Sequence, residues 1–246
     1  MSVLNEKVAI VTGSSKGIGA EIAKYLAYNG ATIVVNYANN KVNADNVVRE
    51  ITQNGSKAIC IQADISKPEN VKTLFKETIS QFGKVDILVN NAGIMINSLI
   101  KDATTEDFEK QININLKGVF NTLKEASTQL ADNGSIINIS STVTRTIFPT
   151  YGMYSATKSA VQQLSCVFAK EIGHRGINVN CVLPGPTGTD LFLKGKSEEN
   201  ITQLANSNAF KRLGRPLDIA KIVAFLVTDE AKWINGQNIG ANGGMA

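Results

Sequence analysis

The chain has 246 residues, 43% hydrophobic and 19% charged, which is typical of a globular protein with room for one large α/β domain. Its 25 Lys and Arg and 21 Asp and Glu give a formal charge of +4 and are scattered, with no basic run suited to a nucleic-acid backbone. This pattern argues against a nucleic-acid partner, and no apolar run approaches the ~18 residues of a membrane span.

The cysteines and the N-terminal residues indicate a reducing compartment. Cys60, Cys166 and Cys181 lie far apart in apolar stretches, which predicts reduced core residues and neither a disulfide framework nor a metal site. Residues 1–7 lead into a strand without the features of a secretory signal. We therefore expect a cytoplasmic protein without a bound metal.

Short β-branched runs alternate with helical periodicity along the whole chain, which predicts a parallel sheet covered by helices on both faces. The expected fold is a single-domain, doubly wound Rossmann fold over residues 1–246, with a seven-stranded, mostly parallel sheet. The predicted strands span 8–12, 31–37, 58–62, 86–90, 135–140, 178–183 and 238–240, and the predicted helices span 18–29, 41–53, 68–82, 105–130, 152–173 and 216–229.

A glycine-rich turn follows the first strand, in Gly13-Ser14-Ser15-Lys16-Gly17-Ile18-Gly19. Glycines let the backbone turn tightly and direct N–H groups toward a pyrophosphate at the start of the next helix. Such a turn alone also fits an ordinary strand-to-helix connection. Its position directly between a strand and a helix favours a dinucleotide site.

The second strand ends in Asn36-Tyr37-Ala38-Asn39-Asn40 and has no acidic residue there. A carboxylate at this point would accept a hydrogen bond from a free ribose 2′-hydroxyl, whereas a cation and neutral donors suit a 2′-phosphate. Lys16 in the glycine turn supplies a cation, although a lone lysine in a turn is also often a solvated surface residue. The combination favours NADPH over NADH.

Tyr154 and Lys158 are four residues apart in a predicted helix, after Ser141 at the end of the fifth strand. Residues at this spacing share a helix face, so the Lys158 ammonium would stand near the Tyr154 phenol and favour its ionised form. Carbonyl reduction needs an acid for the oxygen and a donor that stabilises the developing alkoxide, and Tyr154 and Ser141 fit these roles.

Three further polar residues near these positions are weaker candidates. Tyr151 has the wrong spacing from Lys158 and is expected to form a pocket wall, and Ser140 is the lesser candidate beside Ser141. His174 is the single histidine and is expected to end a helix.

Taken together, these motifs resemble the short-chain dehydrogenase/reductase family over essentially the whole chain. The glycine spacing, the Asn90-Asn91-Ala92-Gly93 motif, the Ser-Tyr-Lys set and Pro184-Gly185 all occur in the family's order. The resemblance implies that Asp64 bonds the adenine, that Asn91 and Gly93 lie along the adenosine ribose, and that Thr187 and Thr189 meet the nicotinamide carboxamide or the diphosphate. The full set of residues expected to bind the cofactor comprises Gly13, Ser15, Lys16, Gly17, Ile18, Gly19, Asn36, Asp64, Ile65, Asn91, Ala92, Gly93, Tyr154, Lys158, Pro184, Gly185, Thr187 and Thr189.

The resemblance also implies a fourth catalytic residue and an assembly. Asn115 would hold a water that links Lys158 to solvent, and it is preferred to Asn113 because the sequence that follows it matches the family. The catalytic set is then Asn115, Ser141, Tyr154 and Lys158. The family implies a homotetramer that shares the helices at 105–130 and 152–173.

The pocket walls are expected from residues 94–98, 142–148, Tyr151 and 191–193, with 187–213 as a lid. These walls are mostly apolar, which favours a neutral aldehyde or ketone. Lys211 and Arg212 leave open a 3-oxoacyl-acyl-carrier-protein reductase, because they could attract an acidic carrier. Two further alternatives stay open. Tyr154 could act as a base in the reverse direction, in an NAD-dependent alcohol dehydrogenase. The same fold could also serve a non-catalytic dinucleotide-sensing regulator.

Overall fold

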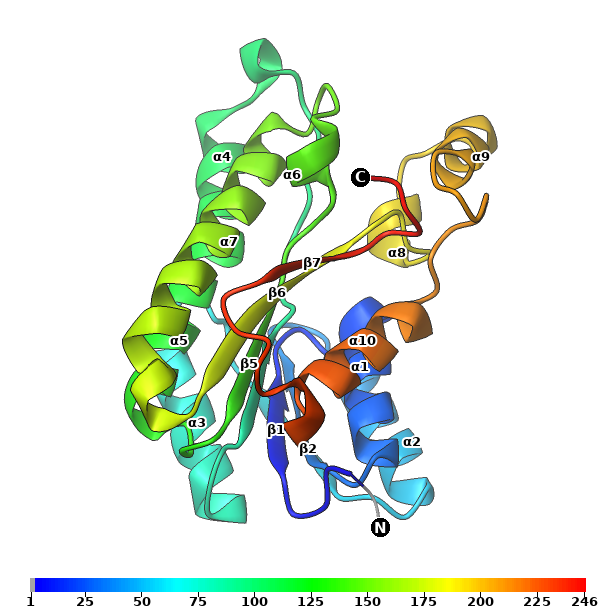
Figure 1. The fold of residues 1–246 in the computed structure, drawn as a ribbon. Helices are drawn as coiled ribbons and strands as arrows, with labels where there is room; N and C mark the ends of the chain where they lie inside the picture. Colours follow the sequence, from blue (N-terminus) through cyan, green and yellow to red (C-terminus); the bar gives the residue numbers. More distant parts are fainter. Residues whose placement is uncertain (1–2) are drawn as a thin grey trace.

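The structure is a computed structural model that describes residues 3–246, and its centre is one seven-stranded sheet with the order β3-β2-β1-β4-β5-β6-β7 (Figure 1). Every neighbouring pair is parallel, so the sheet is more regular than the mostly parallel sheet that the sequence predicts. The strands are β1 (Val8–Val11), β2 (Thr32–Tyr37), β3 (Ala58–Gln62), β4 (Ile87–Asn90), β5 (Ser135–Ile139), β6 (Asn178–Pro184) and β7 (Asn238–Ala241).

Helices cover both faces of this sheet, as Figure 1 shows. α1, α2 and α10 pack on one face, and α3, α5 and α7 pack on the other. The helices are α1 (Gly17–Tyr28), α2 (Lys41–Gln53), α3 (Pro68–Phe82), α4 (Thr105–Gln111), α5 (Gly118–Gln129), α6 (Val143–Thr146), α7 (Gly152–Ile172), α8 (Asp190–Leu193), α9 (Glu198–Asn206) and α10 (Pro216–Leu226).

The strand sequences explain the two-sided packing. Ala9 and Val11 of β1 point into the core on the α1 side, while Ile10 between them joins the core on the α3 side. Successive side chains of a strand alternate between faces, so a strand that is buried on both sides must be apolar throughout. The two cores stabilise the sheet from both faces and fix the direction in which each strand ends.

The predicted helix at 105–130 is interrupted by a π-helical segment, Ile112–Lys117, between α4 and α5. Propensity alone predicts a regular helix here, but the side chain of Asn115 turns inward and bonds the backbone of Ile94. A π segment is a wider turn that recurs at functional sites.

The segment at 187–213, for which the sequence predicts only an irregular lid, contains two helices, α8 and α9. Thr189 caps α8, because its hydroxyl accepts from the Phe192 N–H at 3.3 Å, and Ser197 caps α9 by accepting from the Asn200 N–H at 3.2 Å. A serine followed by an acidic first turn is a recognisable N-cap signal. Figure 1 shows both helices standing away from the sheet beside the end of the chain.

No helix within residues 3–246 has both the length and the apolar character that a membrane span requires.

Candidate active site

The glycine turn between β1 and α1 lies at the point where the sheet order reverses, because β1 pairs with both β2 and β4. Ligands of open parallel sheets bind at such a switch point, outside the carboxyl ends of the strands. Gly13 and Gly17 adopt positive φ values of 61° and 60°. A Cβ at Gly13 would stand 2.7 Å from the Ala92 Cα, so only glycine allows the turn to approach β4 this closely.

Polar side chains fasten this turn to its neighbours. The Thr12 hydroxyl accepts from the backbone N–H groups of Asn91 and Ala92 at 3.0 and 3.1 Å. The Asn91 amide donates in return to the carbonyls of Thr12 and Gly13 at 3.0 and 3.1 Å. These bonds lock the ends of β1 and β4 together before any ligand arrives.

Asn36 braces the other side of the turn. Its Oδ1 accepts from the Gly13 N–H at 3.2 Å, and its Nδ2 donates to the carbonyls of Ile61 and Ala63 at 3.3 and 3.0 Å. The side chain is buried, and these three bonds all run to backbone atoms. The contribution of Asn36 to the cleft is therefore the shape of the glycine turn and the absence of a negative charge.

A long cleft runs over these strand ends and brings together most of the residues that the sequence predicted for the cofactor. Pro184, Gly185 and Thr187 lie instead in the neighbouring cavity, and Gly19 packs against Asn91 beneath the turn. The predicted residues that line the cleft are Gly13, Ser15, Lys16, Gly17, Ile18, Asn36, Asp64, Ile65, Asn91, Ala92, Gly93, Tyr154, Lys158 and Thr189.

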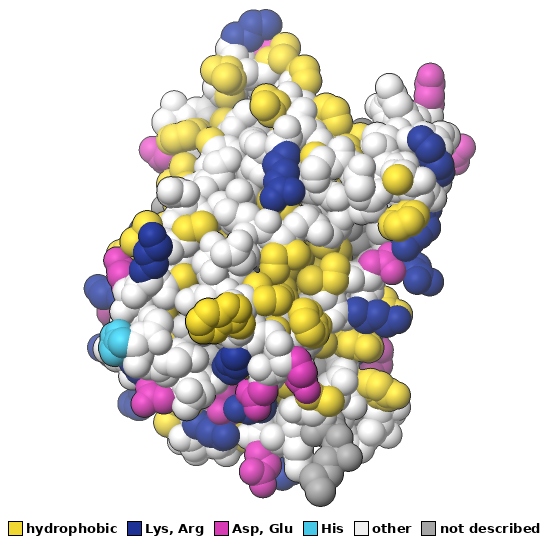
Figure 2. Space-filling view, in the orientation of Figure 1, with side chains coloured by type: hydrophobic (Ala, Val, Ile, Leu, Met, Phe, Trp, Pro, Cys, Tyr) yellow, Lys and Arg dark blue, Asp and Glu magenta, His cyan; other side chains and the backbone are white. Residues whose placement is uncertain are grey.

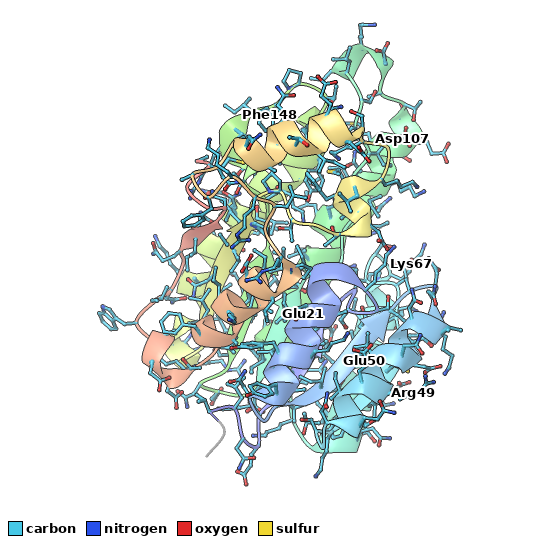
Figure 3. The ribbon with its side chains drawn as sticks, turned by 90° about the vertical axis from the view of Figure 1, so that its right-hand side faces the viewer. Glu21, Arg49, Glu50, Lys67, Asp107 and Phe148 are labelled. Carbon is cyan, nitrogen blue, oxygen red and sulfur yellow. The ribbon has the colours of Figure 1, made fainter. Side chains whose placement is uncertain are left out.

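The neighbouring cavity lies between α6, the start of α7 and the lid. Ser141, Tyr151 and Tyr154 line it, and its walls contain no charged side chain among the described residues. The predicted walls are present as Met95, Thr142, Val143, Thr146, Phe148, Leu191 and Phe192. In Figure 3 the labelled Phe148 lies at the end of the molecule that carries the lid, away from Glu21, Arg49 and Glu50.

Three residues that line the cavity were not named from the sequence: Pro186, which follows β6, Leu204 and Met245. Leu204 comes from α9, and Met245 comes from the segment after β7. The apolar face of α9 was a readable signal for Leu204. Met245 follows a glycine-rich stretch without periodicity, so only the tertiary path of the chain brings it to the cavity.

The cleft and the cavity meet at shared walls, because Ile18, Tyr154, Thr189 and Leu191 line both. Tyr154 is half-buried there, and Ser141 is near enough to its phenol to influence its pKa. Loss of water around the phenol raises the pKa of Tyr154 to about 12, against the opposing effect of the Ser141 hydroxyl. The phenol therefore remains protonated at neutral pH.

The Lys158 ammonium lies near the Tyr154 ring, as the four-residue spacing predicts, and is also bonded to β5. Its Nζ donates to the Ile139 carbonyl at 2.8 Å and lies 5.8 Å from the centre of the Tyr154 ring. Burial lowers the pKa of Lys158 to about 8, since the ammonium has lost most of its water. The pKa of Tyr154 is not shifted toward neutrality as the sequence predicts, because burial of the phenol is the largest cause and acts in the opposite direction.

Asn115 is fully buried beside these groups, whereas Asn113 is exposed. The Asn115 Oδ1 accepts from the Ile94 N–H at 2.8 Å, and its Nδ2 donates to the Ile94 carbonyl at 2.9 Å and to Thr157 Oγ1 at 3.2 Å. A Cβ on Gly93 would lie 3.3 Å from Asn115 Oδ1 and 3.5 Å from Lys158 Nζ, so the two side chains converge at Gly93.

The weaker candidates lie outside the reacting centre or at its wall. Ser140 is buried and donates to the Lys158 carbonyl at 3.1 Å, which ties β5 to α7. His174 is exposed in the turn after α7, where its Nδ1 lies 3.0 Å from the Glu171 carbonyl oxygen. No cluster of His, Cys, Asp or Glu suited to a metal ion occurs within residues 3–246.

Comparison with known proteins agrees with this architecture. A family model described as enoyl-(acyl carrier protein) reductase matches residues 13–246. NADPH-dependent aldehyde reductase 2, chloroplastic, of Arabidopsis thaliana is 43% identical over 97% of this chain and 93% of its own. A 3-oxoacyl-(acyl-carrier-protein) reductase of Staphylococcus epidermidis is also 43% identical, over 97% of this chain and 98% of its own.

A solved structure extends the likeness to three dimensions. The short-chain dehydrogenase of Burkholderia cenocepacia, crystallised in complex with NADP, is 35% identical and has a TM-score of 0.94 over 99% of both chains. The chain therefore belongs to the short-chain dehydrogenase/reductase family.

Proposed function

We propose that this protein reduces an aldehyde or ketone to an alcohol with NADPH, and that Tyr154 is the general acid. The observation that carries the proposal is the meeting of the cleft and the apolar cavity at Tyr154, with Ser141 in the wall of the same cavity. A carbonyl group in the cavity can reach both hydroxyls from one position.

The residues that line the cleft suit a dinucleotide that carries a 2′-phosphate. The glycine turn lines the cleft, and Lys16 is exposed at its edge. The end of β2 carries Asn36, Asn39 and Asn40 in place of an acid. The aldehyde reductase of Arabidopsis thaliana is named for NADPH, and the Burkholderia structure contains NADP. When bound, NADPH supplies the hydride.

The residues of the chain orient the carbonyl and supply the proton. Ser141 donates a hydrogen bond to the carbonyl oxygen, and Tyr154 transfers the phenolic proton to that oxygen as negative charge develops on it. We assign Lys158 to returning a proton to Tyr154, since its lowered pKa makes the ammonium a readier proton source than an exposed lysine. We assign Asn115 to holding the water that connects Lys158 to solvent.

The test is NADPH oxidation, and separately NADH oxidation, with an aldehyde, a cyclic ketone, a 1,2-dicarbonyl and a 3-oxoacyl thioester. We expect turnover with NADPH, and a fall of about 10²- to 10⁴-fold in kcat for Tyr154→Phe, because the variant cannot donate the proton. NADPH binding, followed by fluorescence, should be unchanged.

Tyr151→Phe is the matched control, because Tyr151 lines the same cavity. It should keep most of the activity. Wild-type turnover by Tyr154→Phe would contradict the role of Tyr154, and a protein that binds NADPH but reduces no carbonyl would favour the dinucleotide-sensing regulator. Faster alcohol oxidation with NAD would favour the alcohol dehydrogenase.

The likeness to the 3-oxoacyl reductase of Staphylococcus epidermidis favours a second candidate, reduction of a carrier-bound acyl group. The two cations that could attract an acidic carrier are otherwise engaged. Arg212 pairs with Asp218 at 2.6 Å, and Lys211 donates to the Asn206 carbonyl at 2.8 Å. Neither lines the apolar cavity, so we favour a free carbonyl compound.

Two exposed apolar faces support assembly as a homotetramer. One is a groove between the π segment, α5 and α7, where Phe120 and Val167 are each about half exposed. The second lies over α10 and the connection to β7, where Phe225 and Trp233 are exposed and where Figure 2 shows hydrophobic side chains gathered. Two separate faces on one subunit are what a tetramer built from two kinds of dimer contact requires.

A further inference from the structure

The segment that follows β7 runs back to the mouth of the apolar cavity. In Figure 1 it lies between α6 and the lid helices α8 and α9. Met245 in this segment is half-buried and lines the same cavity as Ser141 and Tyr154. A wall of the reacting centre is thus contributed by residues about ninety positions away along the chain from the catalytic tyrosine.

Asn242 fixes the path of this segment with four hydrogen bonds. Its Oδ1 accepts from the N–H groups of Gly244 and Met245 at 3.1 and 3.2 Å. Its Nδ2 donates to the Ala246 main-chain oxygen at 2.8 Å and to Thr142 Oγ1 at 3.2 Å. Thr142 follows Ser141 directly, so Asn242 connects the segment to the loop that carries the carbonyl-binding hydroxyl.

The segment is also held from two further sides. Arg145 of α6 donates to the main-chain oxygens of Ala246 and Asn238 at 3.4 and 3.0 Å. At the end of the lid, the Ala209 N–H donates to the Gly243 carbonyl at 2.9 Å. Gly243 has a φ of 66°, and a Cβ there would stand 2.9 Å from Asn208 Oδ1. The position of Met245 therefore follows from contacts with both α6 and the lid.

We infer that Met245 determines which carbonyl compounds the enzyme accepts, and that Asn242 is the residue that positions it. The inference rests on the proposed function and narrows it to uncharged carbonyl compounds with an apolar substituent, which contacts the Met245 side chain. The thioether is apolar and flexible, and it lines a cavity whose described walls carry no charge. A substituent that fills the cavity is favoured by dispersion and by loss of water from its surface.

The test compares propanal with octanal in wild type, Met245→Ala and Met245→Phe. One methylene group in an apolar pocket changes kcat/KM by about 10- to 200-fold, so changes of this size in the ratio of octanal to propanal are expected. Met245→Ala should raise the ratio at least about tenfold and Met245→Phe should lower it similarly. Met153→Ala is the control, because Met153 does not line the cavity, and it should leave the ratio unchanged.

The failure of this inference is distinguishable from failure of the proposed function. If the wild type reduces both aldehydes and the octanal to propanal ratio is equal in all three proteins, the reductase function stands and the role of Met245 is overturned. A wild type that reduces no carbonyl overturns the proposed function. A binding measurement then shows whether Met245 contacts an apolar ligand in the cavity.

The binding measurement uses protein labelled with ¹³C at the methionine methyl groups and 1-octanol as the probe. Single replacements by leucine assign the signals. We expect 1-octanol to shift the signals of Met245 and Met95, which both line the cavity, and to leave Met153 unmoved. Spectra in which the Met245 signal does not respond overturn the inference.

Asn242→Ala tests the positioning role separately. Loss of the four hydrogen bonds releases Met245, so the octanal to propanal ratio should rise as in Met245→Ala, while NADPH binding stays unchanged. Asn242→Asp keeps an oxygen that accepts from Gly244 and Met245, and it should restore part of the wild-type ratio. A ratio in Asn242→Ala that equals the wild-type value would remove Asn242 from the proposal.

Discussion

Lys16 is an exposed cation at the edge of the cleft, and the end of β2 at the same cleft carries no acidic residue. A lysine acts on a phosphate as a point charge, so its removal should weaken binding of NADPH and leave NADH almost unaffected. We expect Lys16→Ala to raise the Kd of NADPH by about tenfold, corresponding to about 1.4 kcal/mol. Fluorescence titration with each dinucleotide measures this.

Lys24→Ala is the control for that titration, because Lys24 pairs with Glu50 and does not line the cleft. Its Kd values should match the wild type. Equal losses of NADPH and NADH binding in Lys16→Ala would contradict a contact with the 2′-phosphate.

The buried ammonium of Lys158 makes stability depend on pH. The pKa of Lys158 is about 8 in the folded protein, whereas the ordinary value for a lysine, taken for the unfolded chain, is 10.5. At a pH between these two values the unfolded chain holds a proton that the folded protein has released. Stability therefore rises with pH across this window. Relative to Lys158→Met, the wild type should gain up to about 1.4 kcal/mol of unfolding free energy per pH unit from pH 8 to pH 10.

Urea unfolding of both proteins at pH 7, 8, 9 and 10 measures the difference. The comparison with Lys158→Met cancels the titration of all other groups. A difference that is constant over this range would show that Lys158 is not buried as a neutral group at high pH.

The sequence predicted that Ser141, Tyr154 and Lys158 lie near one another, but not their electrostatic relation. The four-residue spacing of Tyr154 and Lys158 fixes a shared helix face. The direction of the ammonium depends on the Ile139 carbonyl of β5, and the pKa of Tyr154 depends on burial by surrounding elements. Both are tertiary effects, so local spacing could not reveal them, and Met245 was missed for the same reason.

At the scale of elements, strands and long helices were predictable because their apolar periodicity reflects burial. The bounds of α2 and α3 agree with the prediction at both ends. The π segment was not predictable, since its one buried side chain, Asn115, finds its hydrogen-bond partners only through the tertiary fold. The helices α8 and α9 were missed because they are short and have no fully buried side chain. The fold and the family were confirmed, while the catalytic and cofactor-binding assignments remain predictions.

The turn that ends α6 contains a strained residue. Ile147 has a φ of 53° and a ψ of 46°, which is a left-handed conformation unfavourable for a β-branched side chain, and it is 81% exposed. Asparagine tolerates this conformation better. Ile147→Asn should therefore raise the free energy of unfolding by about 1 kcal/mol, measured by urea titration.

Ile100 provides a matched control, because it is also 81% exposed and is not among the residues with positive φ. Ile100→Asn should bring no such gain. Equal effects of the two substitutions would indicate that loss of exposed apolar surface, and not relief of strain, is responsible.

At the scale of the whole molecule, the groove between α5 and α7 is expected to be covered by a second subunit. A carboxylate in the middle of an apolar interface loses its water without gaining a partner. Phe120→Glu should therefore convert the proposed tetramer into dimers, as measured by light scattering after size-exclusion chromatography.

Tyr28→Glu is the control for assembly, because Tyr28 is an exposed aromatic residue at the end of α1 and does not line the groove between α5 and α7. Its mass in solution should equal that of the wild type. A wild type that is monomeric at micromolar concentration would contradict the proposed assembly.

The shared walls of the cleft and the cavity have a thermodynamic consequence. Ile18, Tyr154, Thr189 and Leu191 serve both spaces, so a molecule in one space contacts side chains that shape the other. The two binding equilibria are then coupled, and the coupling is reciprocal. Whatever factor the dinucleotide contributes to the affinity for the carbonyl compound, the carbonyl compound must contribute to the affinity for the dinucleotide.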